Sequence, residues 1–205
     1  TLRCDHPDIE AFIDAKRDPR RFRNFNLSVL APDAFMAALE ADADWPLVFE
    51  GRQVRTVRAS ELWRRLMQAT YDAAEPGVIF IDQVNARNNL DYCETITASN
   101  PCGEQMLPPY GACLLGSINL ARLVTSPFQP GAELDEGGLS ELAHTAVRML
   151  DNVIDLSRYP LKAQEKEAKT KRRIGLGVTG LADALVFCGV PYGSDAAAAL
   201  TGRWL

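Results

Sequence analysis

An amide, a thiol and a carboxylate alternate along one short segment, at Asn100, Cys102 and Glu104. Pro101 disfavours the α-helical region for the residue before it, and Gly103 weakens any helix. We therefore predict an extended segment, in which alternate residues share one face. The three side chains would then point the same way. Together they could hydrogen-bond a substrate hydroxyl, deprotonate it and supply a reactive sulfur.

A polar loop with a buried cysteine is the alternative interpretation of the same spacing. No histidine lies near Cys102 in the sequence, so a thiolate activated by histidine is not indicated. A neighbouring carboxylate disfavours a thiolate by like-charge repulsion. The chemistry left open for Cys102 is that of a neutral thiol or of a sulfur radical.

A second pattern, G-x-G-x-x-G, occurs at Gly175, Gly177 and Gly180. A dinucleotide site would need a buried strand before the pattern and an acidic residue about 20 positions after it. The stretch before it, 169–173, is basic, and residues 197–200 are Ala-Ala-Ala-Leu. We therefore favour glycines that allow close helix packing at a turn.

The metal-ligating residue types are sparse. The chain has five cysteines without a C-x-x-C pair, and two histidines, His6 and His144, far apart in sequence. A structural zinc site needs four converging ligands, usually in close pairs, so we predict no metal site. Reduced thiols in the cytoplasm are the default, most of them buried and inert.

The composition is that of a folded domain: 205 residues, 47% hydrophobic, with a net charge of −5. These values exclude disorder of the whole chain. The acidic balance argues against a nucleic-acid partner, and no apolar run is long enough to span a membrane. The chain begins at Thr1 without an initiator methionine or a signal-like layout. We expect a piece of a longer chain.

Strand and helix patterns alternate along the chain, which predicts an α/β fold with mostly parallel strands. Strands are expected at 25–29, 45–49, 78–81 and 174–178. Helices are expected from residue 33 and at 61–74, capped by Ser60, and at 139–156, 162–173 and 181–188. The stretches 51–57 and 127–138 are expected to be connections. The irregular stretch 82–110 is typical of a functional loop.

Three longer motifs carry a resemblance to a known family. They are Asn-Pro-Cys-Gly-Glu-Gln at 100–105, Leu-Pro-Pro-Tyr-Gly-Ala-Cys at 107–113 and Leu-Gly-Ser-Ile-Asn-Leu at 115–120. The chain resembles the catalytic subunit of ribonucleotide reductases, nearest to the class II, adenosylcobalamin-dependent type. Flanking stretches agree, among them Phe-Asn-Leu-Ser-Val at 25–29 and Arg-Ile-Gly-Leu-Gly at 173–177.

The resemblance implies part of a ten-stranded α/β barrel with a central finger loop. Residues 1–205 would be the central portion of the barrel domain, with the finger at about 82–110. Cys102 resembles the thiyl-radical cysteine that takes the ribose 3′ hydrogen, Glu104 the base for the 3′ hydroxyl, and Asn100 the partner of the ribose hydroxyls. Cys113 resembles one redox-active thiol of the reducing pair. The implied substrate-binding residues are Asn100, Pro101, Cys102, Gly103 and Glu104.

The resemblance also implies adenosylcobalamin as the cofactor, with no binding residues mapped on this chain. The implied partners are a ribonucleotide substrate and a thioredoxin-like or small dithiol reductant. We expect a homodimer of the full-length protein, and no activity from residues 1–205 alone. Two alternatives stay open. One is a class I large subunit with a metal-containing radical partner, and the other is an inactive truncated remnant.

Overall fold

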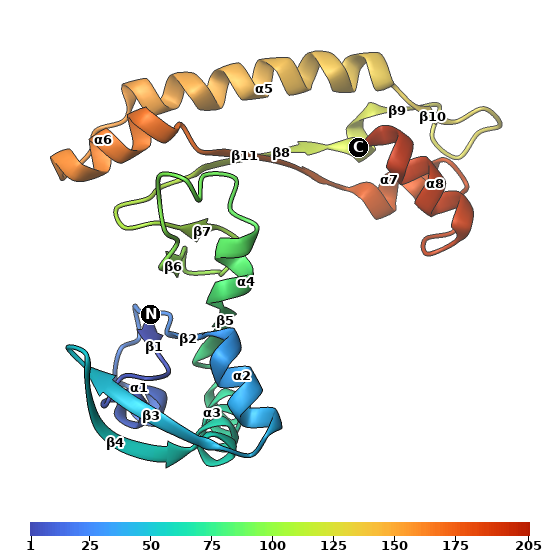
Figure 1. Cartoon of the computed structure of the whole chain (residues 1–205). Helices are drawn as coiled ribbons and strands as arrows, with labels where there is room; N and C mark the ends of the chain where they lie inside the picture. The colour runs from blue at the N-terminus through green and yellow to red at the C-terminus, as the bar shows by residue number, and fades with distance from the viewer. The chain divides into compact units, whose positions relative to one another are not determined.

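The computed structural model describes residues 1–205 throughout, and the chain folds into two compact units, Thr1–Pro109 and Tyr110–Leu205 (Figure 1). Each unit mixes helices with strands, which confirms the predicted α/β class. The strands form five small sheets, and none of them closes into a barrel within these residues. Parallel and antiparallel pairings are equally frequent, three of each, where mostly parallel pairing was expected. The antiparallel pairs are all local hairpins.

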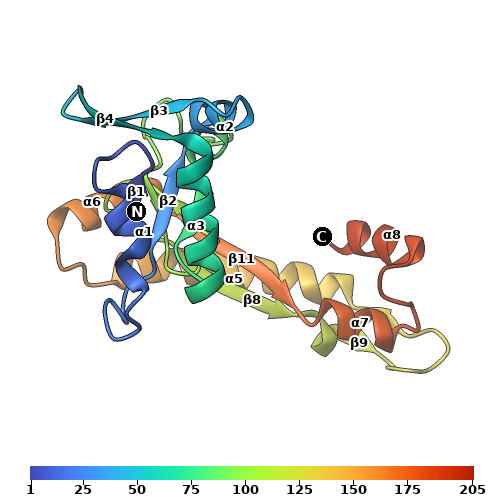
Figure 2. The same cartoon turned by 90° about the horizontal axis from the view of Figure 1, so that it is seen from below.

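The first unit is built around a parallel sheet of order β1-β2-β5. Its elements are β1 (Leu2–Arg3), α1 (Ile9–Ile13), the 3₁₀ turn η1 (Asp14–Lys16), β2 (Ser28–Ala31), α2 (Asp33–Glu40), β3 (Asp44–Phe49), β4 (Arg52–Arg58), α3 (Ala59–Ala73), β5 (Gly77–Phe80), α4 (Ile81–Ala86), β6 (Ala98–Ser99) and β7 (Met106–Leu107). Figure 2 shows α3 from below, beside the β3–β4 hairpin.

Aromatic packing defines the core of this unit. Phe35 is fully buried, with its ring centroid 5.2 Å from that of Trp45 and 6.3 Å from that of Trp63. These three rings come from α2, β3 and α3, so the core joins the hairpin to both helices. Burial of large aromatic side chains contributes strongly to core stability.

Three details of this unit differ from the sequence prediction. The strand expected at 25–29 lies at Ser28–Ala31, because pairing with β5 starts at Ser28 opposite Gly77. The polar stretch 51–57 is not a connection but forms most of β4, an exposed strand that pairs with β3. Ser60 does not cap α3, since that helix starts at Ala59 and the Ser60 hydroxyl donates to Asp42 Oδ1 at 2.5 Å.

The stretch 82–110 is less irregular than expected, because it holds most of α4 and the short β6–β7 hairpin. The side chain of Asn85 closes the base of this segment. Its Oδ1 accepts from the Ile96 N–H at 2.8 Å, and its Nδ2 donates to the Ile96 carbonyl at 3.0 Å. This pair of bonds fixes where the chain leaves α4 and turns into the hairpin.

The second unit is built on one parallel pair, β8 (Leu114–Asn119) and β11 (Ile174–Thr179), which run in register from Leu114 opposite Ile174. Its other elements are the 3₁₀ turn η2 (Leu120–Leu123), β9 (Val124–Thr125), β10 (Glu133–Leu134), α5 (Glu136–Leu156), α6 (Lys162–Lys171), α7 (Leu181–Phe187) and α8 (Asp195–Trp204). The long helix α5 runs along the β8–β11 pair (Figure 1).

The helix α5 packs against the strand pair. A Cβ at Gly116 would lie 3.5 Å from a methyl group of Leu150, an ordinary van der Waals distance, so the strand and the helix are in packing contact there. Leu150 and Ile154 are the buried residues of α5. The stretch 127–138, expected as a polar linker, contains β10 and the first turn of α5, which Asp135 caps by accepting from the Gly138 N–H.

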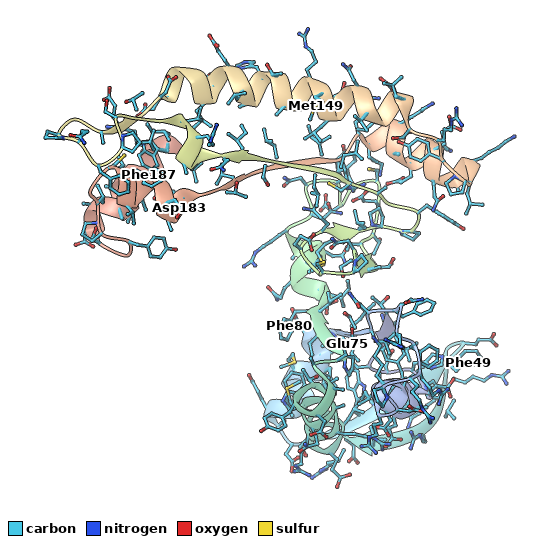
Figure 3. All side chains as sticks on the ribbon, turned by 180° about the vertical axis from the view of Figure 1, so that it is seen from behind. Phe49, Glu75, Phe80, Met149, Asp183 and Phe187 are labelled. Carbon is cyan, nitrogen blue, oxygen red and sulfur yellow. The ribbon has the colours of Figure 1, made fainter.

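A second cluster, around α7 and α8, completes this unit. Leu120 and Leu185 are buried in it, and Phe187, labelled in Figure 3, packs against Phe128 with ring centroids 4.9 Å apart. The helix expected at 162–173 ends at Lys171, and the guanidinium of the next residue, Arg172, pairs with Asp151 and Asp155 of α5 at 2.7 and 2.9 Å. The helix α6 is thereby tied to α5 just before β11 begins.

The glycine pattern lies at a strand-to-helix turn. Gly175 and Gly177 belong to β11, and Gly180 precedes α7 with φ of +69°. A Cβ on Gly180 would lie 2.6 Å from Asn119 Oδ1. Close packing at a turn is therefore confirmed for Gly180, while the other two glycines are strand residues. None of the helices combines the length with the apolar character that crossing a bilayer requires.

We predict opposite effects of alanine at two glycines of the second unit. In the full-length protein, Gly180→Ala should lower the free energy of unfolding by about 1–3 kcal/mol, because of its left-handed conformation and the contact with Asn119. Gly202→Ala lies in α8 with open space around it and should raise that free energy by about 0.5–1 kcal/mol. Thermal unfolding midpoints measure both, and equal shifts would contradict the argument.

Candidate active site

The residues singled out first lie in the loop of the β6–β7 hairpin. The strands pair antiparallel, Ser99 opposite Met106, so the chain must reverse over residues 100–105. The Asn100 N–H donates to the Gln105 carbonyl at 3.0 Å, and the Gly103 N–H donates to the Asn100 carbonyl at 3.1 Å. The predicted extended segment is therefore wrong. The reversal is a turn, and Gly103 adopts the left-handed conformation that it needs, with φ of +84°.

The turn still brings two of the three side chains together. Asn100 Nδ2 donates to Glu104 Oε1 at 2.6 Å, and Asn100 Oδ1 accepts from the Gln105 N–H at 3.0 Å. One N–H of the Asn100 amide and the second carboxylate oxygen of Glu104 remain outside these bonds. The pair can therefore donate to and accept from a hydroxyl placed beside it.

Cys102 lies between them in the same turn. Its side chain is exposed, so the alternative of a buried cysteine in a polar loop is wrong. Pro101, Gly103 and Glu104 are exposed as well, so the tip of the loop, residues 101–104, is accessible. The turn therefore presents an exposed thiol between the two residues of the bonded amide–carboxylate pair.

Cys113 belongs to the second unit and lies directly before β8. It is half-buried, and its Sγ lies 3.7 Å from the Leu114 carbonyl oxygen. The strand register sets Cys113 beside Arg173, since the Leu114 N–H donates to the Arg173 carbonyl at 3.3 Å. Burial raises the pKa of the Cys113 thiol, and the positive charge of Arg173 acts against that rise.

The other cysteines are unlike these two. Cys4 is buried, and burial raises the pKa of its thiol to about 12. Cys188 is half-buried with a raised pKa, also through burial, and Cys93 is exposed. All five thiols are free, and only Cys4 is fully buried, so the expectation of mostly buried thiols is wrong. No group of three or more His, Cys, Asp or Glu side chains is arranged to hold a metal ion.

One contact to the tip was missed by the sequence analysis. Asn26 Nδ2 donates to the carbonyl oxygen of Pro101 at 2.7 Å, across 75 positions of the chain. The only local signal was a polar residue between Phe25 and Leu27 in a strand-like pattern. That pattern gives no information on what such a residue contacts.

The comparisons with known proteins agree with the resemblance. The family model described as "Ribonucleotide reductase, barrel domain" matches residues 1–205. The chain is 42% identical to the vitamin B12-dependent ribonucleoside-diphosphate reductase of Mycobacterium tuberculosis, over 98% of the chain and 29% of the relative. Its identity to the enzyme of that name from Thermoplasma acidophilum is 38%, over 94% of the chain and 25% of the relative.

A third relative bears a different name. The ribonucleoside-diphosphate reductase subunit alpha of Chlamydia trachomatis is 31% identical, over 94% of the chain and 21% of the relative. The chain thus spans less than a third of the length of each of these relatives.

The positive charge of Arg173 near Cys113 predicts a pH effect. Arg173→Gln removes the positive charge that opposes the effect of burial, so the pKa of Cys113 should rise further. Alkylation of Cys113 by iodoacetamide, followed by mass spectrometry across pH, should then need a more alkaline pH, because the thiolate is the reactive form. Arg173→Lys should keep the profile of the unmodified protein. Arg203→Gln, on α8, is the control, and an unchanged profile for Arg173→Gln would contradict the assignment.

Proposed function

This chain belongs to the ribonucleotide reductase barrel-domain family, and we propose on that basis that it is the central portion of that domain in a longer catalytic subunit. The subunit would reduce ribonucleotides to 2′-deoxyribonucleotides. The observation that carries the proposal is the hydrogen bond between Asn100 and Glu104 in the exposed turn that presents Cys102. The finger loop of the domain would be the segment at about 82–110.

The residues of the turn would supply one chemical group for each early step of the proposed reaction. Cys102, as a thiyl radical, would remove the 3′ hydrogen of the ribose. Glu104 would accept the proton of the 3′ hydroxyl through its oxygen that Asn100 leaves free. The remaining N–H of Asn100 would donate to a ribose hydroxyl. The backbone of Pro101 and Gly103 completes the surface that would contact the substrate.

Cys113 would supply reducing equivalents. In the net reaction the C2′–O bond breaks, a C2′–H bond forms, water leaves, and two thiols become a disulfide. A dithiol of a thioredoxin-like protein or of a small molecule would reduce that disulfide again. We assign no partner thiol among residues 1–205. Cys4 is a poor candidate because it is buried and its pKa is raised to about 12.

We propose adenosylcobalamin as the cofactor, because the relatives at 42% and 38% identity are named vitamin B12-dependent. When bound, it would supply the radical that removes the hydrogen atom of the Cys102 thiol. The exposed thiol is compatible with this role, because no described residue buries it. The described residues supply that thiol, and we assign none of them to hold the cofactor.

Membership of this family also bears on the class of the enzyme, its assembly and its setting. The class I large subunit remains the second candidate, supported by the 31% identity to a subunit alpha. An inactive remnant is disfavoured because Asn100 and Glu104 keep their mutual bond. We propose a homodimer of the full-length protein and a reducing, cytoplasmic setting, which suits five free thiols.

We predict that Cys102→Ser in the full-length protein abolishes deoxynucleotide formation, because a hydroxyl cannot replace a reversible thiyl. The measurement is product formed with ribonucleotide, adenosylcobalamin and a dithiol. Cys93→Ser is the matched control, an exposed cysteine of the same segment, and should retain the activity of the unmodified protein. Substantial turnover by Cys102→Ser would refute the assignment.

We predict a different loss for Cys113→Ser. The chemistry at Cys102 can begin without it, but the thiol pair that supplies two electrons is then incomplete, so this variant should act on substrate without completing deoxynucleotide formation. Release of tritium from a 3′-tritiated ribonucleotide, measured beside the deoxynucleotide formed, separates this from the complete loss expected for Cys102→Ser. Cys188→Ser, a half-buried thiol of the same unit, should turn over normally. Sustained turnover by Cys113→Ser would exclude it from the reducing pair.

A further inference from the structure

We propose that Asn26 is a positioning residue for the thiol of Cys102, acting through the carbonyl group of Pro101. The inference rests on the proposed function, because it assigns Asn26 a part in placing the reactive sulfur. The side chain of Asn26 reaches the peptide group that joins Pro101 to Cys102, and so restrains the backbone from which the thiol projects.

The contact is direct and comes from far along the chain. Asn26 Nδ2 lies 2.7 Å from the Pro101 oxygen, a strong geometry for a neutral hydrogen bond. The other hydrogen bonds described for residues 100–105 lie within the hairpin itself. Since Pro101 to Glu104 are exposed, packing does not fix the apex. The bond from Asn26 is therefore the hydrogen bond that connects residues 100–105 to the rest of the first unit.

The backbone that follows Asn26 is held in place. The neighbouring Leu27 carbonyl accepts from the Gly77 N–H at 2.9 Å, and from Ser28 onward the chain is strand β2, in the centre of the sheet. A backbone paired on both sides moves little. The Asn26 side chain thus projects from the chain just before the central strand, β2, and reaches the Pro101 carbonyl.

The backbone that precedes Asn26 is held in place as well. Lys16 Nζ donates to the Phe25 carbonyl and forms an ion pair with Glu75, which is labelled in Figure 3 just before β5. Both of these charged side chains are mostly buried, at 16% and 20% exposure. A continuous series of contacts therefore runs from Glu75 through Lys16 and the Phe25 peptide to Asn26 and Pro101. The placement of Cys102 would depend on all of them.

Hydrogen-atom transfer is sensitive to this placement. A misplacement of about 1 Å can cost about 100-fold in rate, because reacting groups must be held in a near-attack geometry. A nucleotide would also be held by groups outside this turn, so its KM should change less than kcat. Positioning therefore predicts a loss in kcat at nearly constant KM. A purely structural anchor predicts instead a loss of stability, with activity falling only as the folded fraction falls.

The test uses Asn26→Ala and Asn26→Asp in the full-length protein. Aspartate keeps the shape but places an acceptor against the Pro101 carbonyl, so both variants lose the bond. We expect kcat to fall about 10- to 100-fold in both, with KM within about twofold and an unchanged melting midpoint. Asn26→Gln, which retains an amide donor, should recover part of the rate. Gln53→Ala removes an exposed amide donor from the β3–β4 hairpin and should behave as the unmodified protein.

A second readout does not depend on catalysis. Hydrogen–deuterium exchange of peptides covering 96–107 should rise in Asn26→Ala and stay constant in Gln53→Ala, because only the first variant frees the tip. Unmodified kcat, or unmodified exchange at the tip, in both Asn26 variants would overturn the proposal. Failure of both to fold, or a kcat that falls only with the melting midpoint, would show a structural anchor and overturn it too. Full activity of Cys102→Ser would instead refute the proposed function itself.

Discussion

The carboxamide of Asn100 closes the turn on which the proposed chemistry depends. Its nitrogen donates to Glu104 at 2.6 Å and its oxygen accepts from the Gln105 N–H at 3.0 Å, so one planar group bridges both arms of the loop. An amide offers a donor and an acceptor on two different atoms of one planar group. The group that would orient the substrate is thus also the group that shapes the loop presenting the thiol.

The two thiols assigned to the reaction are held by different means. Cys102 lies in an exposed turn, fixed by side-chain bonds and with few packing contacts. Cys113 lies half-buried at the start of an in-register parallel strand pair, beside Arg173. A strand end has little freedom, whereas an exposed turn yields more easily. The placement of Cys102 would therefore depend on the few bonds that hold its turn, whereas the strand pair holds Cys113.

Local patterns in the sequence were sufficient to predict much of the fold. The amphipathic helix α5 and the apolar strand β5 were predicted within a few residues, because an apolar repeat or run marks such an element. The same pattern did not report burial, since Leu142 and Val147 of α5 are exposed. Strand β4 was missed, since its residues are exposed and only its pairing with β3 orders them. The turn at 100–105 was missed for a related reason. Its shape follows from the pairing of Ser99 with Met106, and its link to Asn26 spans 75 positions.

The parallel pairing of β8 with β11 has a consequence for synthesis on the ribosome. More than fifty residues separate the end of one strand from the start of the other. At roughly 5–20 residues per second, β8 waits several seconds for its only partner in this unit. During that interval α5 can form from local bonds alone. The helix then shortens the gap that the strands must close, and it covers one face of β8 while the nascent chain is incomplete.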